Sequence, residues 1–512
     1  MYKSRALMSS ITSACLLIAF FVLAGAAQGA ATRQGDLLGP RYQNAPQLRL
    51  GTRQRPRSGL GSIQRWNEIT LNANALDHDP VALGAPTEQG GPVKTARAFA
   101  IVHIAIFDAV NAIAGGYRGY TGIAAAPLGT SMAAAVAQAA HDTLVYLYPA
   151  QQNDFDEFLL EDLNRIPDRQ SKTNGIALGR RAAAAILDLR VNDGSVAGEP
   201  IYGSGYDPDP ALGKWRKDPI SKIPVALGAY WSAKVKPFVL ASADQFPTPE
   251  PPALDSAEFA RAFNEVKRLG GCGDNAVACA LDDDGSLTPT TRTSEQTQIG
   301  IYWGYDGAPG LGTPPRLYNQ IAMKIAAQMR SDPVELARLL ALINVAMADA
   351  GLAAWATKYD DEFARPITAI REASLYNNGE IDGDPEWTPL GAPASNRMDV
   401  PNFTPPFPAY TSGHATFGAA LFQTLRKFYR TDRIPFSFVS DEFNGETTDN
   451  TGTPRPRVSR TFRSFSQAEE ENGQSRIYLG IHWAFDKAAG IDQGRRVADY
   501  VMDNVFTSLR RR

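Results

Sequence analysis

The stretch Phe407-Pro-Ala-Tyr-Thr-Ser-Gly-His414 opens the helical pattern around which the last quarter of the chain is organised. Ser412 directly precedes apolar residues at helical spacing, from Phe417 to Phe428, so we expect Ser412 to cap a helix start. The N–H groups of such a first turn, that of Gly413 among them, have no partner inside the helix and attract anions. A helix that begins here predicts an oxyanion site beside it.

Two cations lie before this stretch, around the end of a long helical pattern. The pattern starts at Asp332-Pro333, an N-cap followed by proline, and its apolar face runs as far as Lys358. Arg365 follows seven residues later, and Pro366 biases it toward an extended conformation while suiting the first position of a new helix. We therefore expect the long helix to deliver Lys358 to the pocket and a bend to bring Arg365 beside it.

A third cation and a second histidine follow the stretch. Arg476 precedes His482 by six residues, and Ser466-Gln-Ala-Glu469 predicts a capped start for the helix that carries Arg476. Asp486 follows His482 by four residues, so on a helix the two side chains share a face and the carboxylate can orient the imidazole. Three cations, a helix N-terminus and two histidines suit a tetrahedral oxyanion that carries two or three charges.

The three motifs, in this order, resemble the signature shared by vanadium-dependent haloperoxidases and type-2 phosphatidic acid phosphatases. They are Lys-x6-Arg-Pro at 358–366, Ser-Gly-His at 412–414 and Ser-Arg-x5-His-x3-Asp at 475–486. Thr411 departs from the usual pattern, which has proline before Ser-Gly-His. The 60 residues between the second and third motifs exceed the usual gap in the phosphatases, and this favours a haloperoxidase.

The resemblance implies a vanadate cofactor and a role for each site residue. His482 would be the one residue bonded to vanadium, and His414 would be the general acid/base toward hydrogen peroxide. The metal would act as a Lewis acid, with Lys358 polarising the peroxide, so that a halide is oxidised to hypohalous acid. The oxygens of vanadate would accept hydrogen bonds from Lys358, Arg365, Ser412, Gly413 and Arg476.

Two carboxylates are expected to support these residues. Asp486 would orient His482, as its spacing suggests. Asp306 opens a linker at 306–315 that also resembles haloperoxidases, and we expect it to pair with an arginine of the site.

Trp355 and Phe407 are the candidate halide pocket, because they resemble the Trp and Phe pairing of chloroperoxidases, where bromoperoxidases tend to carry Arg and His. An apolar wall excludes water and leaves the field of Lys358 unscreened, which the oxidation of chloride needs most. Ordinary hydrophobic packing of both rings is the alternative.

Two other functions remain open for the same residues. In a secreted acid phosphatase, His482 would be the phosphoryl acceptor, Asp486 its orienting group and His414 the acid that protonates the leaving alcohol. A non-catalytic oxyanion-binding protein would need the cations but not His414. A haem peroxidase is disfavoured, since the chain has no Cys-x-x-Cys-His attachment sequence.

The whole sequence predicts a mainly α protein, because helical patterns recur and strand signals are few. Its 512 residues are 44% hydrophobic and can bury a sizeable core. We expect two four-helix-bundle-like units with long loops: an N-terminal bundle and loops at 61–250, and a C-terminal bundle at 251–512 that carries the site. A formal net charge of −3 argues against nucleic acid as a general partner.

The N-terminus predicts export. Residues 1–31 carry Lys3 and Arg5, an apolar run and then small residues, which is typical of a secretory signal, and a poorly ordered arm follows at 32–60. We therefore expect a secreted or periplasmic protein. We expect no segment after residue 31 to be long and apolar enough to span a bilayer, so stable membrane insertion is not expected. In an oxidising compartment Cys272 and Cys279 are expected to pair.

The remaining polar signals have ordinary interpretations. His78, His103 and His141 are expected to be hydrogen-bonded core or packing residues. The acidic run Asp282-Asp-Asp-Gly285 lacks the spacing of an EF-hand, so a solvated turn is expected there instead of a calcium site.

Overall fold

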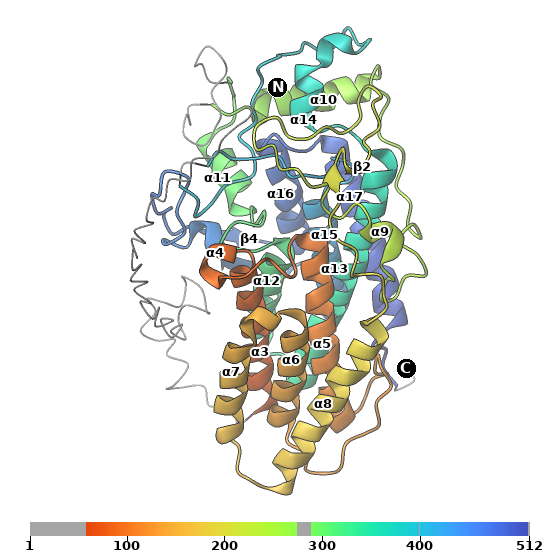
Figure 1. The fold of residues 1–512 in the computed structure, drawn as a ribbon, viewed down its shortest axis with the longest axis vertical. Helices are drawn as coiled ribbons and strands as arrows, with labels where there is room; N and C mark the ends of the chain where they lie inside the picture. The colour runs from red at the N-terminus through yellow and green to blue at the C-terminus, as the bar shows by residue number, and fades with distance from the viewer. Residues whose placement is uncertain (1–57, 274–287, 399, 510–512) are drawn as a thin grey trace, which may run out of the picture.

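The computed structural model describes residues 58–273, 288–398 and 400–509, which form a mainly helical protein (Figure 1), and the predicted fold class is confirmed. The N-terminal helices are α3 (Gly59–Asp77), α4 (Pro80–Leu83), α5 (Pro92–Ala114), α6 (Met132–Leu147), α7 (Gln152–Asn164), α8 (Gln170–Arg190) and α9 (Trp231–Lys234). The C-terminal helices are α10 (Ala257–Gly270), α11 (Ser294–Tyr302), α12 (Pro314–Gln328), α13 (Pro333–Asp361), α14 (Pro366–Arg371), α15 (Gly413–Tyr429), α16 (Phe465–Tyr478) and α17 (Ala484–Asn504).

The other elements are short. The 3-10 helices are η1 (Pro149–Gln151), η2 (Ala373–Leu375) and η3 (Asp441–Phe443). The strands are β1 (Ile201–Tyr202), β2 (Gly205–Tyr206), β3 (Phe436–Val439) and β4 (Ser459–Phe462). β1 and β2 pair in parallel, whereas β3 and β4 form an antiparallel hairpin in which Phe436 lies opposite Phe462.

The first bundle consists of α3, α5, α6, α7 and α8, which lie together at one end of the long axis (Figure 1). α5 is its central helix, and its run of small and branched apolar residues from Ala98 to Val110 is fully covered by neighbours. α8 approaches α6 closely because it has glycine at the contact: a Cβ on Gly179 would lie 2.6 Å from the carbonyl oxygen of Ala135. Close contact of this kind buries the apolar faces that stabilise the bundle.

The second bundle is built from α13, α15, α16 and α17, with α12 against it. Its longest helix, α13, also packs along α5, so one continuous hydrophobic core runs through both bundles. Asp332 caps α13 with Glu335 in a capping box, and Ser412 caps α15, so both predicted helix starts are confirmed. The helix of the third motif begins differently: Ser464, not Ser466, is the cap of α16.

α5 and α13 are both long and apolar enough to cross a membrane, as judged by length and composition alone. The expectation that no segment after the signal meets this criterion is therefore wrong. In the most apolar window of each helix, 83% of α5 and 94% of α13 is buried inside the protein. Their apolar surfaces thus serve the shared core, as those of central helices in a helical protein do.

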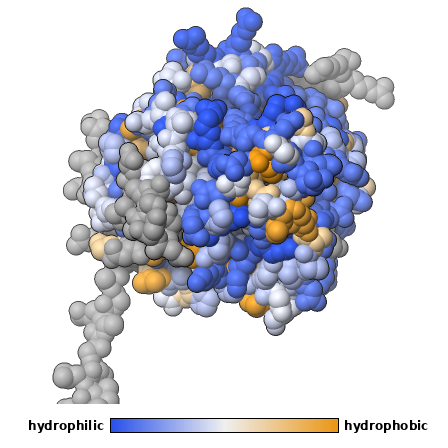
Figure 2. All heavy atoms as spheres, turned by 90° about the horizontal axis from the view of Figure 1, so that it is seen from above, coloured by the Kyte–Doolittle hydropathy of each residue, from blue (hydrophilic) through white to orange (hydrophobic). Residues whose placement is uncertain are grey.

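Long loops cover the end of the molecule opposite the first bundle. Residues 191–256 cross this region, and the buried carboxylate of Asp349 on α13 anchors them by accepting hydrogen bonds from three consecutive amides, those of Phe238, Val239 and Leu240. The face seen from this end is mainly hydrophilic, with a small apolar area (Figure 2).

Three predictions from the sequence concern histidines, and the structure shows a different environment for each. Nδ1 of His78 lies 2.8 Å from the Asn74 carbonyl oxygen, and His141 contacts Asp142 and Asp156 through its two ring nitrogens. His103 is a packing residue, the other expected case: it is fully buried, and neither of its ring nitrogens has a hydrogen-bond partner among the described residues. Burial among apolar side chains of α5 lowers its pKa to about 3, so this ring is neutral.

Some expectations fall on parts of the chain outside the described residues: the signal at 1–31, nearly all of the arm at 32–60, the acidic run at 282–285, and Cys279. Cys272 lies inside the described part and is disulfide-bonded.

Candidate active site

The three sequence motifs meet because of the order and direction of four helices. α13 ends, α15 begins, α16 ends and α17 begins at the same end of the second bundle, as successive antiparallel helices require. The backbone N–H of Ser412 donates to the carbonyl of Asp486 at 3.1 Å, which ties the start of α15 to the start of α17. The Ser412 hydroxyl accepts from the Ala415 amide, so the cap leaves the N–H groups of Gly413 and His414 outside the helical hydrogen-bond pattern.

Arg365 is fully buried at the N-cap position of α14, where Pro366 holds the preceding residue extended, as predicted. Its Nε donates to the Phe407 carbonyl at 2.9 Å, and its Nη1 donates to the Ile481 carbonyl at 2.7 Å and to Nε2 of His482 at 3.0 Å. Nη2 has no hydrogen-bond partner among the described residues. Burial lowers the pKa of Arg365 to about 9, which still leaves it charged at neutral pH.

Arg476 is the second buried guanidinium and is 1% exposed. Its Nη2 donates to Oδ1 of Asp306 at 2.7 Å, which is the arrangement expected for that carboxylate. Its Nε and Nη1 lack a hydrogen-bond partner within the described chain. Unpaired buried donors on a cation are costly, so the site is built to receive an anion between the two arginines.

Lys358 reaches the same region from the last turn of α13 and is fully buried. Its ammonium donates to the carbonyl oxygens of Pro408 and Ala409, both at 2.9 Å, and to that of Thr411. Burial, with a smaller effect of Arg365, lowers its pKa well below the usual value. The side chain therefore holds the loop before Ser412 in place, a role that its position in the motif did not suggest.

His482 and Asp486 are in contact, although not in the predicted way. His482 lies before the N-cap Trp483, outside α17, so the two residues do not share a helix face. Instead Oδ2 of Asp486 lies 2.8 Å from Nδ1 of His482 and accepts the Trp483 amide at 3.1 Å, so one carboxylate caps the helix and orients the ring.

The protonation of this pair follows from its surroundings. Burial and the nearby cations, Arg365 first, lower the pKa of His482 well below its usual value. Burial raises the pKa of Asp486 to about 7. A neutral His482 that donates from Nδ1 to Asp486 has its lone pair on Nε2, which here accepts from Arg365; Nε2 can act as a metal ligand or nucleophile once that hydrogen bond is given up.

His414 lies in the first turn of α15 and its tautomer is also defined. Nε2 lies 2.7 Å from the carbonyl oxygen of Gly304, which can only accept, so Nε2 carries the proton. Nδ1 of the neutral ring is then an acceptor. Burial, followed by the charge of Arg476, lowers the pKa of His414 to about 4, and Asp306 lies 4.0 Å from Nε2 and opposes this shift.

Trp355 and Phe407 form an aromatic wall over the cations, with ring centroids 4.9 Å apart. The ammonium of Lys358 lies 5.5 Å from the Trp355 ring and 5.1 Å from the Phe407 ring, and the Arg365 guanidinium lies 4.9 Å from Phe407. The Trp355 indole N–H donates to the Leu227 carbonyl, so the loops that cover this end complete the wall. Both rings are nearly fully buried beside the charged groups.

Three supporting residues escaped sequence reasoning. Besides Gly304, they are Tyr318 on α12 and Asn472 on α16, which donate to the His414 carbonyl at 2.9 Å and 2.8 Å. Asn472 lies one turn before the third motif, which is a local signal, but nothing in the sequence connects Gly304 or Tyr318 with a histidine about 100 residues later.

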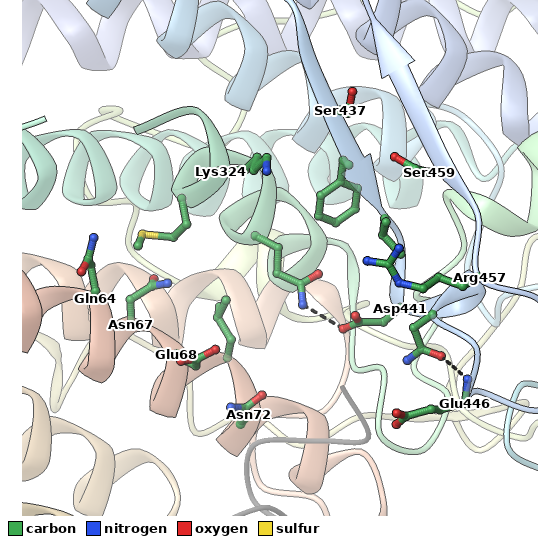
Figure 3. Close-up of a pocket in the computed structure, with 16 residues that line it drawn as sticks. Gln64, Asn67, Glu68, Asn72, Lys324, Ser437, Asp441, Glu446, Arg457 and Ser459 are labelled. Atoms are coloured by element: carbon green, nitrogen blue, oxygen red, sulfur yellow. Dashed lines mark hydrogen bonds between the residues drawn. The ribbon is translucent and has the colours of Figure 1, made fainter. Parts of the chain in front are cut away.

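A polar cleft of about 850 Å³ lies elsewhere, between α3, α12 and the β3–β4 hairpin (Figure 3), and none of the site residues lines it.

In the described chain no group of three or more His, Cys, Asp or Glu side chains is placed to hold a metal ion. The unpaired guanidinium nitrogens of Arg365 and Arg476 suit a metal that arrives as an oxyanion, because its oxygens can accept their charged hydrogen bonds.

Comparisons with known proteins agree with this geometry. A family model described as the VCPO second helical-bundle domain matches residues 338–511, the part that carries the three motifs. Vanadium chloroperoxidase of Curvularia inaequalis is 33% identical in an alignment 500 positions long, which covers 83% of this chain and 79% of the relative.

Solved structures show the same relationship. The first bacterial vanadium-dependent iodoperoxidase aligns with a TM-score of 0.64 at 26% identity, over 88% of this chain and 96% of that one. A holo-type bacterial vanadium-dependent chloroperoxidase aligns with a TM-score of 0.58 over 83% of this chain and 95% of that one, and its 18% identity shows a shared fold. The family model matches the second bundle, and a relative is 33% identical in an alignment that covers 83% of this chain. The chain therefore belongs to the vanadium-dependent haloperoxidases.

Proposed function

We propose that this protein binds vanadate at the junction of α13, α15, α16 and α17 and oxidises halide ions with hydrogen peroxide. The reaction consumes one peroxide, one halide and one proton and yields hypohalous acid and water. The observation that carries the proposal is the set of three buried guanidinium nitrogens, Nη2 of Arg365 and Nε and Nη1 of Arg476, that lack partners among the described residues beside a neutral histidine.

These residues fit vanadate. Arg365 and Arg476 supply the unpaired donors that a multiply charged oxyanion needs, and the N-terminus of α15 at Gly413 adds backbone N–H groups. His482 would bind vanadium through Nε2, the ring nitrogen that bears the lone pair. Bound vanadate would supply Lewis-acid activation of hydrogen peroxide.

The chain's own residues handle the proton. The Gly304 carbonyl keeps the proton of His414 on Nε2, so Nδ1 can accept one from incoming hydrogen peroxide. A pKa of about 4 keeps the ring in this base form at neutral pH. Lys358 contributes positive charge and holds residues 408–411, the backbone that leads into the oxyanion site.

For the halide, we propose that chloride is oxidised as well as bromide and iodide. The contact between Trp355 and Phe407 supports this, because both rings are buried against Lys358 and exclude water from its surroundings. Desolvation strengthens the electrostatic effect of that cation, and chloride is the hardest of the three halides to oxidise. The relatives named above include both a chloroperoxidase and an iodoperoxidase, so the aromatic wall is the basis of the choice.

We also propose that the protein is exported. The signal-like sequence at 1–31 supports this, and so does the disulfide at Cys272, since such bonds persist in oxidising compartments.

The test is to strip the purified protein with a phosphate-free chelator, add back vanadate, and measure peroxide-dependent halogenation of a phenolic dye with chloride, bromide and iodide. Vanadate should restore halogenation, and phosphate should compete with it for the same cations. Equal halogenation without vanadium would overturn the proposal. Hydrolysis of a phosphate ester by the vanadate-free protein, with no halogenation after vanadate addition, would establish the acid phosphatase alternative instead.

A further inference from the structure

Residues 303–306, between α11 and α12, make two of the contacts that define the site. The Gly304 carbonyl accepts from Nε2 of His414 at 2.7 Å, and the Asp306 carboxylate pairs with Arg476 at 2.7 Å. A shift of this short segment would therefore disturb the general base and one anion-binding arginine together.

The backbone of the segment needs support. Tyr305 lies between the two contact residues with a φ of +59°, in the left-handed region that a bulky side chain rarely adopts. Such a conformation costs on the order of 1 kcal/mol or more and persists only where neighbouring groups hold it. The Tyr305 hydroxyl donates to Oε1 of Gln320 on α12 at 3.0 Å, but the described structure shows no hydrogen bond between the Tyr305 backbone and the rest of the segment, so support for this backbone must come from outside it.

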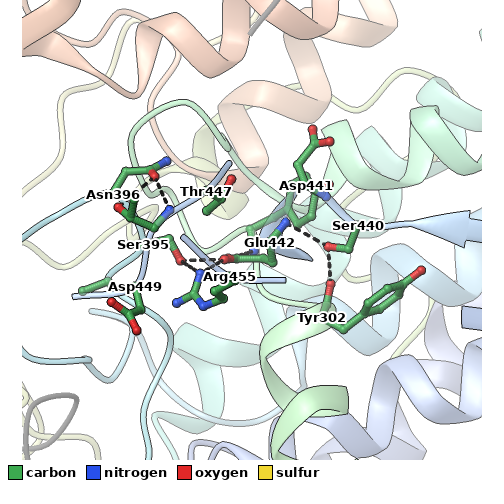
Figure 4. A network of polar contacts seen from close by, with 12 residues as sticks. Tyr302, Ser395, Asn396, Ser440, Asp441, Glu442, Thr447, Asp449 and Arg455 are labelled. Carbon is green, nitrogen blue, oxygen red and sulfur yellow. Dashed lines mark hydrogen bonds and ion pairs between the residues drawn. The ribbon is translucent and has the colours of Figure 1, made fainter. Parts of the chain in front are cut away.

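Support comes from η3, in the insertion between α15 and α16 (Figure 4). Oε1 of Glu442 accepts the Tyr305 amide at 3.3 Å. The Asp441 amide donates to the Tyr305 hydroxyl at 2.7 Å, and the Ser440 hydroxyl donates to the Tyr302 carbonyl at 2.6 Å. Two residues of the insertion, Asp441 and Glu442, thus bond Tyr305, and Ser440 bonds the last residue of α11 directly before the segment.

Glu442 is itself held rigidly. It is fully buried, and its Oε2 accepts from the Ser395 hydroxyl at 2.5 Å and from Nη1 of Arg455 at 2.7 Å. Figure 4 shows Ser395 and Arg455 meeting this carboxylate. Its other oxygen fills the space under Gly304, where an added Cβ would lie 2.6 Å from Oε1. One oxygen is therefore fixed by an ion pair and the other meets the segment that carries the site contacts.

We propose that Glu442 is a positioning residue for the active site: it holds the Tyr305 amide, and through it the Gly304 carbonyl and Asp306 that fix His414 and Arg476. If Glu442 only stabilised the fold, its effect would depend on its ion pair with Arg455. If it positions the active site, its effect depends on the length of its side chain, because Oε1 must lie within hydrogen-bond distance of the Tyr305 amide. The catalytic consequence rests on the proposed function, whereas the effect on the His414 tautomer does not.

Two substitutions separate reach from charge. Glu442→Asp keeps the charge beside Arg455 but is one methylene too short to meet Tyr305. Glu442→Gln loses the charge but keeps an oxygen that can accept the Tyr305 amide. Ser395→Ala is the matched control, since it removes a hydrogen bond to Oε2 and leaves the contact with Tyr305 intact.

The readout is ¹⁵N NMR of the histidine rings in vanadate-free protein, which is practicable because the chain has only five histidines, with His414 assigned from His414→Gln. Wild type, Glu442→Gln and Ser395→Ala should show His414 protonated on Nε2 alone. Glu442→Asp should show a mixture of tautomers, and with vanadate its halogenation rate should fall by about 10- to 100-fold, as is usual when a group supporting a site residue is lost.

A single Nε2-protonated tautomer in folded Glu442→Asp would overturn the proposal, and so would a larger disturbance in Glu442→Gln than in Glu442→Asp. If Glu442→Asp does not fold, a mixed tautomer in Glu442→Gln alone overturns it equally. If Glu442→Asp changes the His414 tautomer but the wild-type protein with vanadate never halogenates, the proposed function is refuted and the positioning role of Glu442 stands.

Discussion

Replacing Arg476 by methionine removes two unpaired donors from the oxyanion pocket and keeps most of the side-chain volume. A hydrogen bond to a charged group contributes about 1.5–3 kcal/mol, so losing Nε and Nη1 should cost about 3–6 kcal/mol of binding free energy. At about 1.4 kcal/mol per factor of ten, the affinity for vanadate or phosphate should fall about 10²- to 10⁴-fold. Equilibrium dialysis of vanadate and calorimetric titration of phosphate measure this directly.

The same substitution should also destabilise the fold, because Asp306 loses its partner at 2.7 Å. Breaking a buried ion pair by removing one partner costs about 3–5 kcal/mol. Arg97→Met is the matched control, since Arg97 is also buried and pairs with Asp193 at 2.8 Å in the first bundle. It should lose comparable stability in urea unfolding and keep its anion affinity. Wild-type affinity for both anions in folded Arg476→Met would refute the assignment of its donors to the oxyanion.

Three further outcomes are expected. His482→Ala should abolish tight vanadate retention, whereas His414→Ala should keep much of the binding and lose about 10²- to 10⁴-fold in halogenation rate. Equilibrium dialysis and steady-state kinetics test this. Unchanged vanadate affinity in both variants would show that His482 is not the metal ligand. Phe407→His should lower kcat/KM for chloride more than for bromide, because imidazole admits water to the wall, and equal losses would argue that the ring only packs. His103→Leu should make the protein less sensitive to acid. The pKa of His103 is about 3 in the folded state, so as pH falls below its ordinary value of about 6.5 only the unfolded chain takes up this proton and stability is lost. The loss amounts to roughly 3 kcal/mol between pH 7 and pH 4 and can be measured by urea unfolding at both pH values. An equal loss of unfolding free energy in wild type and His103→Leu would contradict this prediction.

The fold class and several helix starts could be predicted because they depend on neighbours in the sequence. Ser412, Asp332 and the Arg365-Pro366 pair act within four residues of themselves, through capping and a fixed proline φ. Where two local signals competed, the prediction failed: Ser464 caps α16, and Glu469, assigned to a cap at Ser466, instead pairs with Arg426 and Arg495.

The expectation that no segment after the signal is long and apolar enough to span a bilayer was wrong, because α5 and α13 meet that criterion. Hydropathy records how apolar a segment is but not what covers it, and in α13 the cover is α5, α15 and α17. For Lys358, too, the sequence predicted the position but not the surroundings. Its place at the end of α13 was predictable, but its three carbonyl partners depend on the path of residues 408–411.

By itself the sequence determined the residue types of the site and their order along the chain, since three motifs at the ends of alternating helices must meet at one end of a bundle. Only the tertiary structure decided the state of those residues. The tautomer of His414 is set by a carbonyl 110 residues earlier in the chain, and Arg476 is oriented by a carboxylate 170 residues earlier. Hydrogen bonds require atoms to lie within about 3 Å, and at such separations along the chain that precision comes from the packing register of whole helices, which no local pattern encodes.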